Sequence, residues 1–428
     1  MFKHGKIIMS TIKFIHCADL HIDSPFKGIS DINEDLREIL YNSTFQSFRN
    51  IVDLAIENKV HAVLIAGDVY DGADKSLKAQ LRFREELKRL SDIGIPSFIV
   101  SGNHDPLDSW AASIEWPEHV HLFSGEKVEK YPLEIDGKIA AEIYGISFPK
   151  RDVTENLSLQ FKRDNQKIPA IAILHTNIGD NTGHKSYAPA TLEDLKSRKM
   201  DYWALGHVHT QKMLNENQPV ILYPGNTQAR NPREPGSKGC TMVTMEKDGS
   251  CQLTHHATDV VRYKSVIVDV SSTGTIDEVI ETIKTECNTV SSEMDGRHVI
   301  VRIALQGRTS VNEELRKGNN LLDILESTRE YFSGSTPVIW LEKIGLDTAG
   351  AYDIETLRQG KDFIADIISL YDDSASLDAE RINDIREFIK PVTETWAGSK
   401  HLEIFTEEEI AKLIEKARDW TLDQMVGE

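Results

Sequence analysis

The sequence lacks any apolar run that approaches the roughly 20 residues needed for a membrane-spanning helix. Its first residues also lack the apolar segment of a secretory signal, so we expect a cytoplasmic protein with no membrane association. Cysteine is scarce, because the chain has 4 and none of them stands in a Cys-x-x-Cys arrangement. This scarcity argues against a disulfide framework and against a thiolate zinc site, and it indicates a reducing compartment.

Positive charge is also in deficit, because 68 acidic residues against 49 basic ones leave a formal net charge of −19. Proteins that bind nucleic acid release counterions through clustered lysine and arginine, so the composition argues against a generally basic surface. Much of the acidity lies late in the chain, from residue 347 onward, where it could be separated from a working site. An anionic substrate is therefore compatible with this composition.

The 428 residues exceed one average domain, and the sequence pattern divides them into three parts. Residues 11–260 alternate short apolar runs with helical patterns, which predicts an α/β domain whose sheets are covered. A compact α+β unit is expected over 261–346, and an acidic helical region over 347–428. The strands expected in the first part are 12–17, 61–66, 97–101, 170–174, 201–206 and 219–223, followed by a hairpin of 239–246 and 251–258. The helices expected in the first part and in the acidic region are 33–58, 75–93, 191–198, 353–370, 377–390 and 406–425.

Two of these helices carry apolar faces that suggest a binding role. The helix 33–58 has a second apolar stripe that includes Tyr41 and Phe45, which either a partner subunit or a loop of the same chain could cover. The helix 406–425 begins with a capping box and presents an apolar stripe over 410–417. An isolated helix of this length is marginally stable, so we expect this stripe to bind a partner.

Residues able to bind a metal follow the expected strands. In an open α/β sheet the ligand crevice lies at the loops that follow the carboxyl ends of the strands. Hard divalent ions such as Mn²⁺ take oxygen and imidazole ligands, and two ions about 3.5–4 Å apart need a carboxylate that bridges them. The sequence supplies these groups in five places: Asp19-Leu20-His21, Gly67-Asp68, Gly102-Asn103-His104-Asp105, His175 and Gly206-His207-Val208-His209.

These groups suffice for two metal sites that share the carboxylate of Asp68. The first site would use Asp68 with Asp19, His21 and His209, and the second would use Asp68 with Asn103, His175 and His207. Any one group occurs often by chance, and the pair His207 and His209 could belong to an ordinary buried strand end. All five groups in one order, each after an apolar run, favour a metal centre over a purely structural role.

The five groups resemble the five signature blocks of the calcineurin-like metallophosphoesterases. The likeness covers roughly residues 11–260. Within that family, the block from His16 to Asp23 and the loop 223–228 are most similar to the bacterial SbcD and YhaO group of DNA repair exonucleases.

The resemblance implies a four-layer α/β/β/α sandwich, two divalent ions that are usually Mn²⁺, and hydrolysis of phosphodiester bonds. It identifies DNA as the expected substrate and DNA repair as the expected role. It also implies a homodimer, a capping domain over 261–346 beside the DNA, and a C-terminal region, 347–428, that docks on an SbcC-like coiled-coil ATPase.

His104 is the residue expected to act on the transition state, by donating a proton or a hydrogen bond to the leaving oxygen. The archaeal and eukaryotic repair nucleases carry a histidine where this chain has Asp71, which leaves His104 as the main candidate. Asp105 could fix the ring of His104, and an ordinary turn carboxylate would fit its position equally well.

Three basic residues near the last metal-binding loop, Arg230, Arg233 and Lys238, could neutralise DNA phosphates. A solvated basic loop is the favoured interpretation of this segment. His16 lies within an expected strand and is interpreted as a core histidine or as a residue behind the metal ligands.

Two other functions fit the same residues less well. A phosphodiesterase or pyrophosphatase that acts on a small nucleotide would use the same chemistry. A non-catalytic scaffold on this fold usually shows lost metal ligands, and this chain retains all of them.

Overall fold

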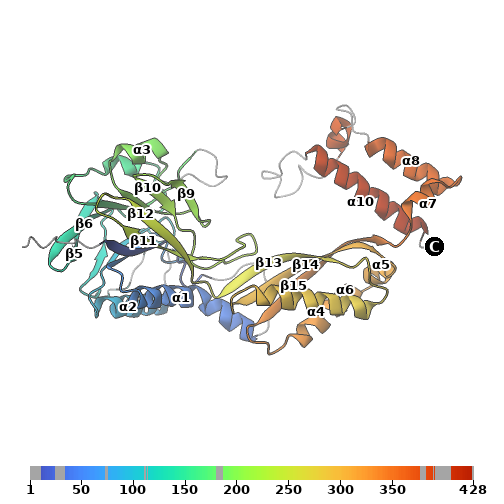
Figure 1. Ribbon diagram of the computed structural model, residues 1–428, viewed down its shortest axis with the longest axis horizontal. Coiled ribbons are helices and arrows are strands. Elements are labelled where there is room, and N and C mark those ends of the chain that lie inside the picture. Colours follow the sequence, from blue (N-terminus) through green and yellow to red (C-terminus); the bar gives the residue numbers. More distant parts are fainter. Residues whose placement is uncertain are drawn as a thin grey trace, which may run out of the picture. The chain divides into compact units, whose positions relative to one another are not determined.

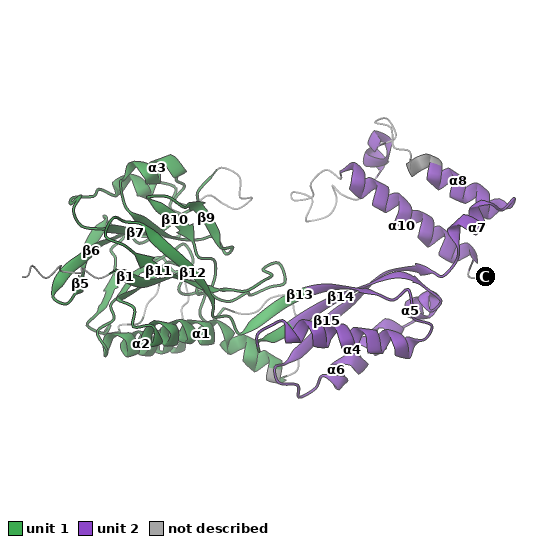
Figure 2. Cartoon of the chain, in the orientation of Figure 1, with its two compact units in different colours: residues 1–264, 296–299 green, residues 265–295, 300–428 purple. Residues whose placement is uncertain are grey.

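The structure of the protein is a computed structural model, which describes residues 11–24, 34–72, 76–109, 112, 114–179, 187–375, 382–388, 390 and 406–426. It contains two compact units, which comprise residues 1–264 with 296–299 and residues 265–295 with 300–428 (Figure 2). Among the described residues, no helix is both long enough and apolar enough to cross a membrane.

Two six-stranded mixed sheets form the first unit (Figure 1). The first sheet has the spatial order β12 (Cys251–Ala257), β11 (Gly239–Met245), β1 (Ile12–Cys17), β2 (Ala62–Ala66), β3 (Ser97–Val100) and β4 (Val120–Leu122). The second sheet has the order β5 (Glu129–Ile135), β6 (Lys138–Gly145), β7 (Ala170–His175), β8 (Tyr202–Gly206), β10 (Val220–Tyr223) and β9 (Lys212–Asn215). Strands β1 to β4 run parallel, and so do β6, β7, β8 and β10.

Three apolar clusters separate four layers, because successive residues of a strand face opposite sides of its sheet. Phe14 of β1 lies in the cluster between the two sheets, whereas Ile15 lies in the cluster under α1 (Glu34–Glu57) and α2 (Leu77–Ser91). On the outer face of the second sheet, Trp203 packs with residues of η1 (Leu157–Gln160) and α3 (Leu192–Ser197). The predicted α/β/β/α sandwich is confirmed.

The second apolar stripe of α1 is covered mainly by α2 of the same chain. The guanidinium of Arg82 in α2 lies 3.7 Å from the centre of the Phe45 ring, and Phe45 is only 8% exposed. Tyr41 keeps 45% of its surface exposed. Of the two expected coverings, a partner subunit or the same chain, the same chain therefore covers Phe45.

Four strands of the first unit, β4, β5, β6 and β9, were not predicted. They lie at or next to the outer edges of the two sheets, and most of their residues are only partly buried. Strands covered on both faces form continuous apolar runs, whereas half-exposed edge strands mix polar and apolar residues and resemble loops.

A third sheet follows residue 260, with the order β13 (Val261–Asp269), β14 (His298–Thr309) and β15 (Ile339–Gly350). Helices α4 (Ile276–Ser292), α5 (Asn312–Arg316) and α6 (Asn320–Tyr331) connect its strands. Strands and helices alternate over 261–350, and both kinds of element were expected in the α+β unit 261–346.

The single helix predicted over 353–370 is wrong, because the chain forms α7 (Ile354–Arg358) and α8 (Phe363–Ala375) instead. The break falls at Gly360, whose backbone N–H donates to Leu357, and Arg358 pairs with Asp372 of α8 at 2.7 Å. Helix α10 (Glu407–Val426) packs against α8 and β15 (Figure 1). Ile410 and Leu422 of α10 are fully buried, so part of its predicted apolar stripe is covered by its own chain.

Candidate metal centre

The residues predicted to bind metal lie where the parallel strands of both sheets end. Asp19 and His21 follow β1, Asp68 follows β2, and Asn103 follows β3 in the first sheet. His175 ends β7, and its register partner Gly206 ends β8 in the second sheet. The two sheets meet here, because the Nδ1 atom of His175 lies 3.0 Å from the carbonyl oxygen of Ala66. One end of the sandwich thus gathers donors from strands far apart in the sequence.

The backbone at this end is strained. Asp19, His21, Asp68 and His207 adopt φ angles of 52°, 45°, 51° and 108°, in the region that side-chain-bearing residues rarely occupy. Such conformations cost about 1–3 kcal/mol each and cluster at functional sites. Gly206 permits the close approach of the sheets, because a Cβ atom there would collide with the Ala66 carbonyl oxygen.

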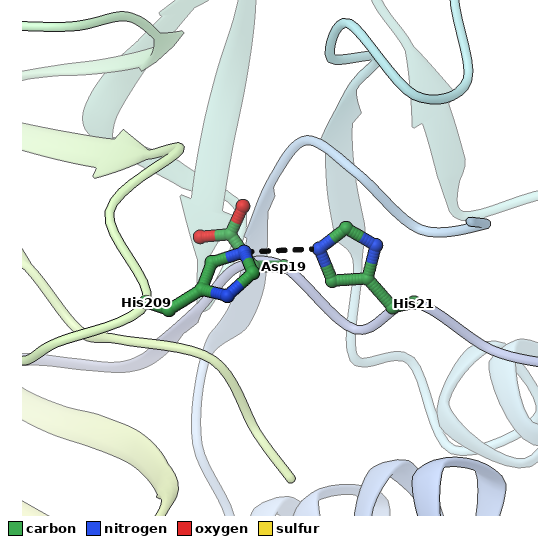
Figure 3. Close-up of side chains that lie close together, drawn as sticks. All are labelled: Asp19, His21 and His209. Atoms are coloured by element: carbon green, nitrogen blue, oxygen red, sulfur yellow. Dashed lines mark hydrogen bonds between the residues drawn. The ribbon is translucent and has the colours of Figure 1, made fainter. Parts of the chain in front are cut away.

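The first donor group consists of Asp19, His21 and His209, whose ligand atoms all lie within 4.8 Å of one another. Figure 3 shows the rings of His21 and His209 facing each other, and their Nε2 atoms lie 3.2 Å apart. Two neutral imidazole nitrogens at this distance repel unless a proton or a cation lies between them. The arrangement therefore fits a bound cation.

The second donor group consists of Asp19, Asp68 and His175, all of them buried. The Nε2 atom of His175 lies 3.4 Å from Asp68 Oδ2 and 3.1 Å from Asn103 Oδ1. Asp19 belongs to both groups, and the Nε2 atom of His21 lies 4.0 Å from Asp68 Oδ2. Both carboxylates are therefore placed between the histidines, as a bridged pair of ions requires.

Charge is concentrated in this buried region. Burial alone would lower the pKa of His175, but the carboxylate of Asp68 raises it to about 9. Burial disfavours the charged form of Asp68, yet the nearby His175 lowers the pKa of this carboxyl well below its ordinary value. Burial lowers the pKa of His21 to about 3, which keeps the ring neutral and able to bind a metal.

The other ring nitrogen of each central histidine lies near an oxygen atom. The Nδ1 contacts are His21 to Asp71 at 3.2 Å, His175 to the Ala66 carbonyl at 3.0 Å and His209 to Glu234 at 2.7 Å. A histidine that binds a metal through one nitrogen usually donates the other N–H to such a group. The residues present therefore fit two divalent ions held through Nε2 atoms and carboxylates.

A third group, His21, Asp71 and His104, adjoins the first. The Oδ1 atom of Asp71 lies 3.2 Å from His104 Nδ1 and 2.9 Å from Arg230 Nη1. Burial favours the neutral carboxyl of Asp71, but hydrogen bonds with His104 and His21 lower its pKa below the ordinary value. The hydrogen bond that His104 donates to Asp71 raises the pKa of His104.

Asp105 does not hold the ring of His104 and is instead a turn carboxylate, the second role that the sequence allowed. Its carboxylate accepts hydrogen bonds from the backbone N–H groups of Gly102 at 2.7 Å and Val69 at 2.9 Å. Asp105 is thus a turn carboxylate that joins two loops, and Asp71 is the carboxylate that contacts the ring of His104.

His207 lies beside the centre, outside the three donor groups found among the described residues. Its backbone N–H donates to Asp19, at 3.1 Å to Oδ1 and 3.0 Å to Oδ2, and its ring centre lies 5.2 Å from that of His175. Asn103 meets the centre through His175. The seven predicted metal ligands and His104 therefore all lie at one end of the sandwich. Among the histidines of this set, His207 is the one whose ring joins none of these groups.

The loop after β10 holds residues that sequence analysis missed or misinterpreted. Glu234 contacts His209 through Oε1, while its Oε2 atom accepts from the Arg230 backbone at 2.8 Å and from Asn226 Nδ2 at 3.1 Å. The solvated-loop interpretation is wrong for Arg230, which contacts Asp71, and for Lys238, which is buried and donates to the His209 carbonyl at 3.1 Å. Glu234 stands 25 residues after His209 without a recognisable spacing, so no local signal pointed to it.

Comparison with known proteins agrees with this geometry. Residues 12–211 match the calcineurin-like phosphoesterase family, and residues 263–349 match the middle domain of the metallophosphoesterase YhaO. The chain is 33% identical over 414 residues to the uncharacterized metallophosphoesterase YhaO of Bacillus subtilis, covering 96% of this chain and 97% of that protein.

More distant relatives are named as nucleases or repair proteins. The DNA double-strand break repair protein Mre11 of Sulfurisphaera tokodaii is 25% identical over 326 residues, which cover 73% of this chain and 79% of that protein. A component of the nuclease SbcCD of Bacillus subtilis is 24% identical over 268 residues, which cover 55% of this chain and 61% of that protein. With a candidate two-metal centre at the strand ends and a YhaO relative along nearly its whole length, this chain belongs to the calcineurin-like metallophosphoesterases.

Proposed function

We propose that this protein is a two-metal phosphodiesterase that acts as a DNA exonuclease in DNA repair. The observation that carries the proposal is the pair of donor groups that share Asp19, with the Nε2 atoms of His21 and His209 facing each other. The relatives named as a nuclease component and as repair proteins support DNA as the substrate.

The metal ligands in this proposal are Asp19, His21, Asp68, Asn103, His175, His207 and His209. Their mixture of carboxylate, amide and imidazole donors suits Mn²⁺. When bound, two such ions lower the pKa of a water molecule and place positive charge opposite the phosphoryl oxygens. His207, whose ring lies at the margin of the centre, would take its place among the ligands when the second ion binds.

His104 is proposed as the acid that serves the leaving oxygen. Asp71 holds Nδ1 of His104 and favours the protonated ring, which leaves the other ring nitrogen to donate. A protonated imidazole can give a proton to the leaving oxygen as the P–O bond breaks. Arg230 pairs with Asp71 and thereby keeps this carboxylate ionised beside the histidine.

The remaining proposals concern partners. The residues after 260 would form the capping domain beside the DNA, and α10 would dock on an SbcC-like coiled-coil ATPase. A homodimer is also proposed, and it rests on the family resemblance, because Arg82 of α2 already covers Phe45 in the second stripe of α1. Light scattering of the purified chain should give the mass of two copies at micromolar concentration, and the mass of one copy would remove the dimer from the proposal.

The experiment that tests the function offers the purified chain, with Mn²⁺, three substrates in parallel: labelled linear duplex DNA, single-stranded DNA and bis(4-nitrophenyl) phosphate. Asp68→Ala should lose all three activities and should release both ions in metal analysis, because Asp68 lies within reach of both donor groups. Asp323→Ala, an exposed carboxylate of α6, is the matched control and should change neither result.

Two outcomes would contradict the proposal. Two tightly held ions in Asp68→Ala would refute the metal assignment. A wild-type chain that cleaves the chromogenic diester and small nucleotides, with every form of DNA left intact, would replace the nuclease with a small-nucleotide phosphodiesterase.

A further inference from the structure

A pocket of about 490 Å³ opens beside His104, next to the group that this histidine forms with Asp71. Its lining residues come from the loops after β2, β3 and β6: Asp71, Gly72, Asn103, His104, Pro106, Asp108, Ser109 and Arg151. The pocket thus begins at the proposed acid and continues outward. The two proposed metal ions do not need this pocket, so it could serve another part of the substrate.

The walls of this pocket are held by the backbone. The N–H of Leu107 donates to the Phe148 carbonyl at 3.0 Å, and the N–H of Asp108 donates to the Pro149 carbonyl at 3.2 Å. These two bonds join the loop that follows His104 to the segment that precedes Arg151. The pocket is therefore a formed feature of the fold, built from described residues.

Arg151 gives the rim of this pocket a positive charge. Arg230, the arginine that contacts the His104 group, is neutralised by Asp71 at 2.9 Å. Arg151 is exposed and forms no salt bridge with any residue that the structure describes, including Asp108 on the same rim. In a chain of net charge −19, an unneutralised guanidinium beside the reaction centre is a ready partner for an anion.

We propose that this pocket is the subsite for the leaving nucleoside, and that Arg151 binds the phosphate on the far side of that nucleoside. The inference rests on the proposed function, in which His104 serves the leaving oxygen. During hydrolysis the oxygen of a water molecule forms a new bond to phosphorus and loses one proton to solvent. The bond to the leaving oxygen breaks, and His104 transfers a proton to that oxygen and is then reprotonated from solvent. The group attached to the leaving oxygen must therefore lie on the His104 side, where the pocket is.

The size of the pocket selects one unstacked nucleoside. Ligand pockets typically measure about 300–1,000 Å³, so this one suits a single small group. A base pair contains two nucleosides, so a pocket that suits one requires the leaving nucleoside to separate from the complementary strand before cleavage.

The test compares three dinucleotides with Mn²⁺: thymidine dinucleotide without a terminal phosphate, the same with a 5′-phosphate, and the same with a 3′-phosphate. Identification of the products shows which nucleoside leaves. The dinucleotide whose extra phosphate is on the leaving nucleoside should have the lowest KM. Arg151→Ala should raise that KM by about 10- to 100-fold, because a charge-assisted hydrogen bond is lost, with kcat nearly unchanged.

Two controls distinguish phosphate binding at this subsite from a general effect of positive charge on KM. Lys150→Ala removes the same charge from the neighbouring exposed residue, which does not line the pocket, and should leave every KM within about twofold. Bis(4-nitrophenyl) phosphate carries no distal phosphate, so Arg151→Ala should cleave it at the wild-type rate.

The results that would refute the subsite differ from those that would refute the proposed function. If Arg151→Ala and wild type show the same preference among the three dinucleotides, the subsite is refuted while the phosphodiesterase stands. If Arg151→Ala also loses activity on bis(4-nitrophenyl) phosphate, Arg151 serves the reaction centre and the subsite is again refuted. If the wild type cleaves no phosphodiester with Mn²⁺, the proposed function and the subsite fall together.

Discussion

Two carboxylates, Asp71 and Glu234, hold the rings of histidines that the reaction would use. Each contacts a histidine at Nδ1 and is itself fixed by further hydrogen bonds, from Ser24 to Asp71 and from Asn226 to Glu234. The hydrogen bond to His209 lowers the pKa of Glu234 to about 2 even though burial opposes this change, so the carboxylate stays ionised. Such partners orient the ring and raise its basicity as a ligand.

Glu234→Ala should therefore weaken the binding of Mn²⁺ by about 10- to 100-fold, the usual cost of losing a partner behind a metal-bound histidine. Glu234→Gln should retain part of the affinity, because its amide oxygen can still accept from His209 Nδ1. Isothermal titration of the metal-free protein measures both effects, with the exposed Glu155→Ala as the matched control. Unchanged Mn²⁺ affinity in a folded Glu234→Ala variant would show that Glu234 only shapes its loop.

His104→Ala should lower kcat on DNA by about 10²–10⁴-fold, the usual contribution of a general acid. Metal content and DNA binding should stay nearly unchanged, because His104 contacts Asp71 and lies outside the two groups proposed to hold metal. The loss should be much smaller on bis(4-nitrophenyl) phosphate, whose leaving group needs little protonation. Equal losses on both substrates would indicate that His104 stabilises phosphoryl charge, and His256→Ala on β12 serves as the histidine control.

At the scale of elements, α10 has both buried and exposed apolar residues. Ile410 and Leu422 are fully buried, while Leu413 and Trp420 remain 40% and 63% exposed. Leu413 and Trp420 are spaced by about two helical turns, which places them on one face. Asp423 anchors the helix by accepting from Asn312 Nδ2 at 2.8 Å. The exposed face is thus available to a partner while the helix stays packed in its own chain.

If α10 docks the ATPase, Leu413→Ala combined with Trp420→Ala should abolish co-purification of that partner. The free energy of unfolding should change little, because exposed substitutions usually cost within about 0.5 kcal/mol. Ile410→Ala is the contrasting variant and should cost about 2–5 kcal/mol by opening a cavity. Denaturant unfolding and co-purification, measured together, check both. Full retention of the partner by the double variant would exclude this face as the docking site.

At the scale of the whole molecule, one buried histidine joins the two large sheets. The Nδ1 atom of His16 in β1 lies 2.9 Å from the hydroxyl of Tyr202, and its Nε2 atom lies 3.1 Å from the carbonyl oxygen of Leu205. Both partners belong to β8 of the other sheet. Burial lowers the pKa of His16 to about 3, so this ring is neutral in the folded protein at ordinary pH.

The free energy of unfolding should therefore fall as the pH drops below about 6.5, where the unfolded chain protonates this histidine and the folded chain does not. The loss continues until the pH approaches the folded pKa of about 3. One such group contributes up to about 1.4 kcal/mol per pH unit. Urea unfolding of the metal-free protein between pH 6.5 and 5.5 should give a steeper slope for wild type than for His16→Gln. Identical slopes would show that His16 is protonated in the folded state.

The strand ends and the candidate metal ligands that follow them could be predicted because the signals are local. Strands covered on both faces, such as β2 and β7, require continuous apolar runs, and the donors follow each run directly. The fold and the gathering of all seven proposed ligands at one end of the sandwich follow from that pattern. The edge strand β5 and its neighbour β6 could not be found in the same way, because they mix exposed and buried residues and have no such runs.

Tertiary structure decided the contacts that join distant segments. Glu234 reaches His209 from a later loop, Asp71 and not Asp105 holds His104, and Arg230 turns inward to Asp71. No periodicity marks such pairs, since a single polar residue in a loop is compatible with solvent or with a buried partner. The sequence by itself determined which strands are covered and which donors end them, because apolar runs must be buried. Which carboxylate serves which histidine was decided only when the two sheets were packed together, because that packing brings separate loops to one point.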